Sequence, residues 1–472
     1  MYTFAQRLKI TAFVLMGLGF IGLAIGFASA PSSVAEAQAM VADTHGGHGD
    51  AHGGEHNTHD AHAVDSHKEK KHHDAHAATD AHDGHHGDKH ADDTHAEDAH
   101  ADDHHGEHLL HQLQNKPWAA LYVAAFFFFM ISLGALLFYA IQRAAQAGWP
   151  ILLFRVMEGI TAYLVPGSII IYVFLVLTGL HANHLFVWMD AETVANDEII
   201  QGKVGYLNVP FFLIRAAIYL LGWNAYRYFS RKFSLAQDAA TAGDISNHKK
   251  NFRISAVFLV FFFVTESMMS WDWIMSLDPH WFSTLFGWYV LASMLVTAVT
   301  VIALVTIYLK SKGYLPKVND SHLHDLAKFM FGLSVFWTYL WFSQFMLIWY
   351  SNIPEEVTYF LTRIDDYNLP FFGMVVMNFV FPLLILMSSD YKRSNWIIVM
   401  AGIVIVLGHY IDIFNMIMPA TVGDQWFIGW AEIGGFLFFA GLFIYVVFRA
   451  LTKVPLEASG DPYVGESELF VY

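Results

Sequence analysis

Long apolar stretches recur along the chain and are separated by short polar connections. A helix needs about 20 mostly apolar residues to cross a hydrocarbon core of roughly 30 Å. The stretches that reach this length are 8–30, 118–142, 160–183, 208–228, 254–276, 284–309, 325–350, 369–389, 395–418 and 426–449. The pattern therefore predicts an all-α polytopic membrane protein with ten transmembrane helices.

Basic residues in the connections predict the orientation of these helices. With a cytoplasmic N-terminus, 18 of the 26 lysines and arginines fall on the cytoplasmic side, and only Lys203 and Arg363 fall in the short outer loops. Cytoplasmic loops normally carry this excess. We therefore expect a multi-pass protein of a bacterial inner membrane, with both termini cytoplasmic. Ala28-Ser29-Ala30 resembles a signal-peptide cleavage site, but Pro31 disfavours cleavage, so the first helix is expected to stay as an anchor.

One polar segment interrupts the apolar pattern. Residues 45–111 hold 20 of the 27 histidines, and residues 43–107 hold 17 acidic residues against four lysines. A segment with so few apolar side chains cannot offset its ordering entropy, so we expect residues 44–111 to form a disordered, His/Asp-rich periplasmic loop. Imidazole and carboxylate bind metals such as zinc, copper and nickel. The loop is either a metal-collecting arm or a solvated tether that meets metals adventitiously, and the sequence leaves the metal unknown.

Composition removes several classes of chemistry. The chain is 55% hydrophobic, 14% charged and free of cysteine. Disulfides, thiolate nucleophiles, cysteine-ligated iron–sulfur clusters and covalent haem are therefore excluded from this chain. No basic surface suggests nucleic-acid binding.

Ionisable side chains inside the predicted spans are the main candidates for function, because they are costly in a bilayer. Glu266 shares one helix face with Ser270 and Trp273. The set suggests a proton pathway; the alternative is internal pairing, of Arg215 with Glu266 or Glu432 and of His409 with Asp412. The candidates are Arg215, Glu266, Asp272, His409, Asp412 and Glu432.

Two long motifs and one short one go beyond composition. They are SWDWIMSLDPHWFSTLFG at 270–287, FWTYLWFSQFMLIWYSNIPEE at 336–356 and FFLIR at 211–215. Together with the ten-helix layout, they resemble the NrfD-like membrane subunits of alternative complex III, a quinol:cytochrome c oxidoreductase. More narrowly, the chain is similar to the ActF-type subunit, whose Bacteroidetes-type members have a long His/Asp-rich insert after the first span.

The resemblance implies a fold of two four-helix bundles with two peripheral helices. The implied parts are an N-terminal anchor 1–43, the loop 44–111, a first bundle 112–283, a second bundle 284–418, and a tenth span with cytoplasmic tail 419–472. It also implies a membrane subunit that supports oxidation of menaquinol-type quinols and conducts protons, without a cofactor of its own. Iron–sulfur clusters and haem c would lie in partner subunits.

The implied partners are an ActC-like sister subunit, an iron–sulfur subunit, multihaem and monohaem cytochromes c, a terminal oxidase and lipids. Weaker quinol-binding candidates lie at the outer end of the third span, and are His181, His184 and Asp190. A different function stays open at this point. A divalent metal (zinc-type) transporter fits the His-rich loop, and His409 and Asp412 place two ligands on one helix face, although such a site normally recruits about four.

Overall fold

The computed structural model describes residues 1–45, 94–241 and 243–471. Across these residues the chain is helical and has no strand. Ten helical runs are long and apolar enough to cross a membrane, so the chain is a multi-pass helical membrane protein. The runs are Gln6–Ala28, Leu109–Ala144, Ile151–Gly179, Val209–Asp238, Ser246–Leu277, Phe286–Ser311, Asp320–Ser351, Asn368–Leu386, Asn395–Val422 and Trp430–Leu451.

Each run overlaps one predicted span, which confirms the fold class, and several continue beyond the apolar stretch as polar helix. The α-helices of the spans are α1 (Gln6–Ala28), α3 (Thr94–Ala144), α4 (Phe154–Ile160), α5 (Leu164–Gly179), α8 (Val209–Asp238), α9 (Ser246–Trp273), α10 (Phe286–Ser311), α11 (Asp320–Ser351), α13 (Asn368–Val375), α14 (Phe381–Leu386), α15 (Asn395–Val422) and α16 (Trp430–Leu451). The remaining α-helices are α2 (Val34–His45), α6 (Ala191–Asn196), α7 (Glu198–Lys203), α12 (Pro354–Asp365) and α17 (Val464–Glu468).

The chain divides into two units, Met1–Ala30 with His111–Tyr472, and Pro31–Leu110. The second unit contains α2 and the first part of α3. Most of the predicted disordered loop, residues 46–93, lies outside the described residues. Residues 94–111 belong to α3, which begins at Thr94. Extending an existing helix costs far less than nucleating one, so the membrane span can carry this polar segment as helix.

Two helices form the centre of the larger unit. In the apolar windows of α3 and α10, 94% and 89% of the residues are buried, whereas most of the corresponding windows of α8 and α9 are not. A Cβ at Gly134 of α3 would lie 2.7 Å from the carbonyl oxygen of Met294 on α10, so the two helices touch through their backbones. Around this centre, α8 packs against α5 and α9, and α10 against α11 and α15. We call α3, α4, α5, α8 and α9 the first helix group and α10, α11, α13, α14 and α15 the second, and α9 and α10 also pack against each other across the two groups.

Glycines bring α1 and α16 into direct backbone contact. A Cβ at Gly434 would lie 2.5 Å from the backbone nitrogen of Leu23, and one at Gly22 would lie 2.9 Å from the Cα of Gly434. Small residues allow this close approach in membrane helices, where dispersion replaces the hydrophobic effect. The two helices expected to be peripheral therefore form a pair, and α16 also packs against α4.

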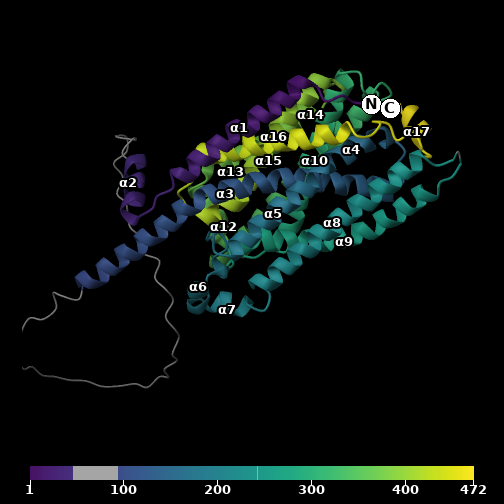
Figure 1. Cartoon of the computed structure of the whole chain (residues 1–472). Helices are drawn as coiled ribbons and strands as arrows, with labels where there is room; N and C mark the ends of the chain where they lie inside the picture. The colour runs from purple at the N-terminus through teal and green to yellow at the C-terminus, as the bar shows by residue number, and fades with distance from the viewer. Residues whose placement is uncertain (46–93, 242, 472) are drawn as a thin grey trace, which may run out of the picture. The chain divides into compact units, whose positions relative to one another are not determined.

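Both termini of the larger unit lie at one end of its helices, and α6, α7 and α12 lie at the other (Figure 1). We call these the terminal end and the loop end. An even number of spans requires the termini to share one end. At the loop end, Asn352 adopts a left-handed conformation that stops α11, and Pro354 starts α12 at a position where its missing N–H costs nothing.

Candidate functional site

A buried ion pair joins α8 and α9 near the loop end. Arg215 donates from Nε and Nη2 to the two carboxylate oxygens of Asp272, at 2.8 and 2.9 Å. The Tyr219 hydroxyl donates to the same carboxylate at 3.1 Å. The guanidinium also lies 3.9 Å from the centre of the Tyr206 ring and donates to the Tyr206 carbonyl oxygen. Bidentate geometry of this kind fixes both partners.

This pair corrects one of the sequence predictions. Arg215 pairs with Asp272, and not with Glu266 or Glu432. Asp272 lies six residues beyond Glu266 on α9, which is about 9 Å along a helix. Because α8 and α9 run antiparallel, that displacement places Asp272, rather than Glu266, level with Arg215.

Glu266 is buried without a cation. Its side chain is 1% exposed, and its Oε1 accepts a hydrogen bond from Ser270 Oγ at 3.2 Å. Within the described part of the chain, no basic side chain lies within ion-pair distance of it. The predicted shared face of α9 is confirmed, because Ser270 and Trp273 are buried with Glu266.

A second buried carboxylate lies in the second helix group. Asp412 of α15 accepts hydrogen bonds from Ser293 Oγ at 2.8 Å, from Trp337 Nε1 at 2.9 Å and from the Tyr289 hydroxyl. His409 Nδ1 lies 3.3 Å from the same carboxylate, so the predicted pairing of His409 with Asp412 is confirmed. The other ring nitrogen of His409 is buried and has no partner in the described structure.

Glu432 has a local structural contact. Its Oε2 accepts a hydrogen bond from the backbone N–H of Gly429 at 2.9 Å, at the start of α16. Capping satisfies a helix-end donor that has no partner within the helix. Lys116 is an electrostatic neighbour of Glu432, and its ammonium lies 2.8 Å from the centre of the Phe427 ring.

The weaker quinol candidates, His181, His184 and Asp190, gather at the loop end. His181 is exposed and has a left-handed backbone, at φ 60°. Burial and the neighbouring His111 lower the pKa of His184. Asp190 is the N-cap of α6 and accepts hydrogen bonds from Thr193, and these hydrogen bonds lower the pKa of Asp190. The capping contact therefore gives Asp190 a structural role at the start of α6.

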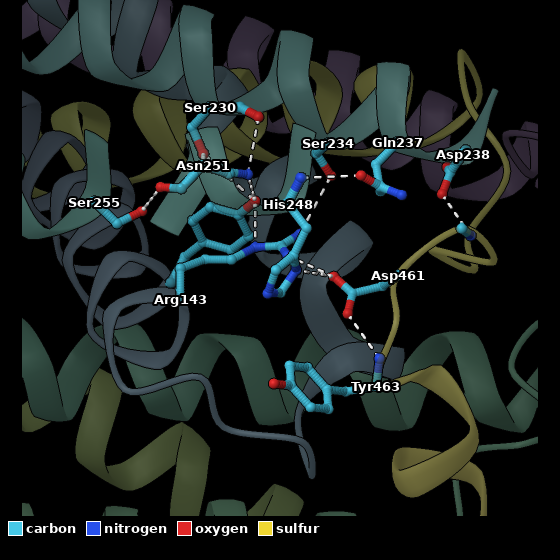
Figure 2. A network of polar contacts seen from close by, with 12 residues as sticks. Arg143, Ser230, Ser234, Gln237, Asp238, His248, Asn251, Ser255, Asp461 and Tyr463 are labelled. Carbon is cyan, nitrogen blue, oxygen red and sulfur yellow. Dashed lines mark hydrogen bonds and ion pairs between the residues drawn. The ribbon is translucent and has the colours of Figure 1, made fainter. Parts of the chain in front are cut away.

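The sequence interpretation missed a network of buried charges at the terminal end. Arg143 of α3 donates to Asp461 of the C-terminal tail at 2.5 Å, and His248 of α9 lies 3.6 Å from the same carboxylate (Figure 2). Burial tends to raise the pKa of Asp461, but the nearby His248 and the Arg143 charge lower it overall. The backbone N–H of Tyr463 donates to the other Asp461 oxygen at 3.2 Å.

A second ion pair lies beside this network. Arg155 contacts Glu158 at 2.6 Å and also Asp238. From the sequence, Arg143 and Arg155 were interpreted only as basic residues of the cytoplasmic connections. Arg155 and Glu158 lie three residues apart on one helix, and this spacing alone could have predicted the ion pair. Buried charges thus occur at both ends of the helices, and not only in the half that holds Asp272 and Asp412.

The described residues contain no group of three or more His, Asp or Glu side chains that could hold a metal. His409 and Asp412 remain a pair without further ligands there. The His-rich segment that carried the metal hypothesis lies largely outside the described residues. No family model matches the chain, and no curated protein matches it.

Proposed function

We propose that the chain is an integral membrane subunit of a respiratory quinol:cytochrome c oxidoreductase of the alternative complex III type. In this proposal it supports quinol oxidation and conducts protons, and the redox centres lie in partner subunits. The orientation proposed from the basic residues places the terminal end in the cytoplasm and the His-rich segment in the periplasm of a bacterial inner membrane.

One observation carries the proposal: each motif behind the resemblance contributes to one of the two buried carboxylate clusters. The motif at 270–287 supplies Asp272 and Ser270, and the motif at 336–356 supplies Trp337, which donates to Asp412. Motifs that served only helix packing would not need a buried charge, because burying one is costly. The carboxylates are the groups that a membrane protein uses to relay protons.

The contacts assign different roles to the carboxyl groups. Asp272 is held by two charge-assisted hydrogen bonds from Arg215, which fix it as a structural anion. Glu266 has no cation to hold it ionised, so it is free to take up and release a proton. We therefore assign proton exchange in the first helix group to Glu266.

Membership of the complex is tested by purification from native membranes under mild solubilisation. The proposal expects iron–sulfur and c-type haem proteins in fixed stoichiometry, a haem c spectrum and quinol oxidation activity. A colourless chain that binds zinc tightly and associates only with itself would contradict the proposal and favour metal transport.

Proton conduction is tested by Glu266→Gln in the purified complex, reconstituted into liposomes that contain a pH-sensitive dye. We expect normal assembly but fewer protons moved per quinol oxidised. Glu432→Gln is a matched control, since it also neutralises a buried glutamate and its amide oxygen still accepts the Gly429 hydrogen bond. Unchanged proton movement in Glu266→Gln, or an equal loss in both variants, would refute the role of Glu266.

A further inference from the structure

Two arginines lie one turn apart on α8, near the terminal end of the first helix group. Arg227 Nε donates to the hydroxyl of Thr161, in the turn between α4 and α5, at 3.2 Å. Arg231 Nη1 donates to the Glu158 carbonyl oxygen at 3.4 Å. Both side chains are half-buried. Because a guanidinium has five N–H donors, each arginine keeps most of its donors available for a further ligand.

The charge around these two arginines is positive. Glu158 is an electrostatic neighbour of both, but its carboxylate already accepts a hydrogen bond from Arg155 at 2.6 Å. Arg155 also contacts Asp238, so three guanidinium groups share two carboxylates there. Among the residues that the structure describes, neither Arg227 nor Arg231 forms an ion pair. Like charges one helical turn apart repel each other, so the pair fits an anion that the chain itself does not supply.

The surface that adjoins Arg227 is apolar. Helices α5 and α8 pack side by side, from Gly179 against Val209 at the loop end to Thr161 against Arg227. Apolar side chains on the outer surface of this helix pair are 42–71% exposed, and they are Val165, Ile169 and Val173 of α5 and Ile214, Ile218 and Leu221 of α8. In a membrane-spanning protein such a surface faces acyl chains.

Arg227 lies at the depth where a phospholipid has its phosphate. It follows Val209, at the start of α8, by 18 residues, which is about 27 Å of helix. The hydrocarbon core of a bilayer is roughly 30 Å thick. The next residue, Tyr228, is exposed, and tyrosine is enriched at the membrane–water interface. The guanidinium pair and the apolar surface therefore match the two parts of a phospholipid, its headgroup and its acyl chains.

We propose that Arg227 and Arg231 bind the phosphate of an acidic phospholipid, whose acyl chains lie along the outer surface of α5 and α8. The planar guanidinium binds phosphate oxygens with two parallel N–H groups, and basic sites between membrane helices are suited to anionic headgroups. A zwitterionic headgroup fits less well, because its ammonium group meets an excess of positive charge. A soluble phosphate compound would leave the adjoining apolar surface unused. This site goes beyond the proposed respiratory function and does not depend on it.

The test is native mass spectrometry of the full-length protein in detergent, titrated with phosphatidylglycerol. Arg227→Gln and Arg231→Gln each remove one guanidinium and should weaken phosphatidylglycerol binding about tenfold or more, because charge-assisted hydrogen bonds are lost. Arg253→Gln is the matched control, since Arg253 is an exposed arginine on the neighbouring helix α9. Salt screens an exposed charge of this kind, so the control should change the affinity by less than about twofold.

Wild-type affinity in both Arg227→Gln and Arg231→Gln would overturn the site, as would an equal loss in Arg253→Gln, because binding would then follow total charge. Phosphatidylcholine with the same acyl chains should bind more weakly and without dependence on Arg227, and equal binding of the two lipids would overturn the acidic headgroup. Glycerol 3-phosphate is the soluble competitor. Displacement of the lipid by an equal concentration of this competitor would show that phosphate alone is recognised, and would overturn the lipid assignment. If Arg227→Gln fails to fold, Arg231→Gln decides.

Discussion

Removing the charge of Asp272 tests whether the ion pair locks α8 to α9. Asp272 is fully buried and accepts three hydrogen bonds, two of them from Arg215. Asp272→Asn keeps the shape and leaves the guanidinium of Arg215 buried without a counter-charge. Breaking a buried pair by removing one partner costs about 3–5 kcal/mol. We expect a loss of that size in the free energy of unfolding.

The assay is reversible unfolding in mixed micelles with increasing dodecyl sulfate, followed by tryptophan fluorescence. Asp365→Asn is the control, because Asp365 is exposed and a surface change of this kind stays within about 0.5 kcal/mol. The double variant Arg215→Met with Asp272→Leu removes both charges and should recover most of the loss. An Asp272→Asn protein as stable as wild type, or a double variant less stable than the single one, would refute the reasoning.

Two further predictions concern the α1–α16 pair and the C-terminal tail. Gly434→Val forces a side chain against the α1 backbone and should lower the free energy of unfolding by about 1–3 kcal/mol in the same assay. Gly332→Val is the control and should cost clearly less, because no atom lies within 4 Å of its new Cβ. Equal losses in the two variants would contradict the close packing of α1 and α16. Asp461→Asn should release the C-terminal tail, detected as faster proteolysis of the tail. Because the pKa of Asp461 is lowered on folding, its stabilisation is present above the unfolded value of 3.8 and lost as the pH falls through the folded value below it. The difference in proteolysis rate between the variant and the wild type should therefore stay constant from pH 8 to pH 5. A steady decline across that range would contradict a lowered pKa of Asp461.

The sequence predicted features that depend on position along a single helix. Span number and approximate bounds follow from apolar length. The shared face of Glu266 and Ser270 follows from helical spacing, as does the pairing of His409 with Asp412. These predictions need no knowledge of how the helices rotate or pack.

Contacts between helices were much harder to predict. One helical turn is 5.4 Å, so an uncertainty of a turn in depth is enough to exchange Glu266 for Asp272 as the partner of Arg215. Ser293 of α10 donates to Asp412 of α15, a contact between helices that no spacing within one helix indicates. The contact of Arg143 with Asp461 joins positions 318 residues apart, and no local pattern indicates where a polar tail returns to the bundle.

The two helix groups also differ in how far their polar side chains extend from the buried aspartate. In the first group, the buried face of α9 between Ser255 and Thr265 is formed by phenylalanines, over about 15 Å of helix. In the second group, Asn378 lies in a π-helical turn with both amide atoms buried and without partners in the described structure. It contacts Gly408, the neighbour of His409, whose Nε2 also lacks a partner. Polar groups thus continue beyond Asp412 toward the terminal end. Unsatisfied groups of this kind attract water, so in the proposed proton conduction the second helix group would be the more continuous route.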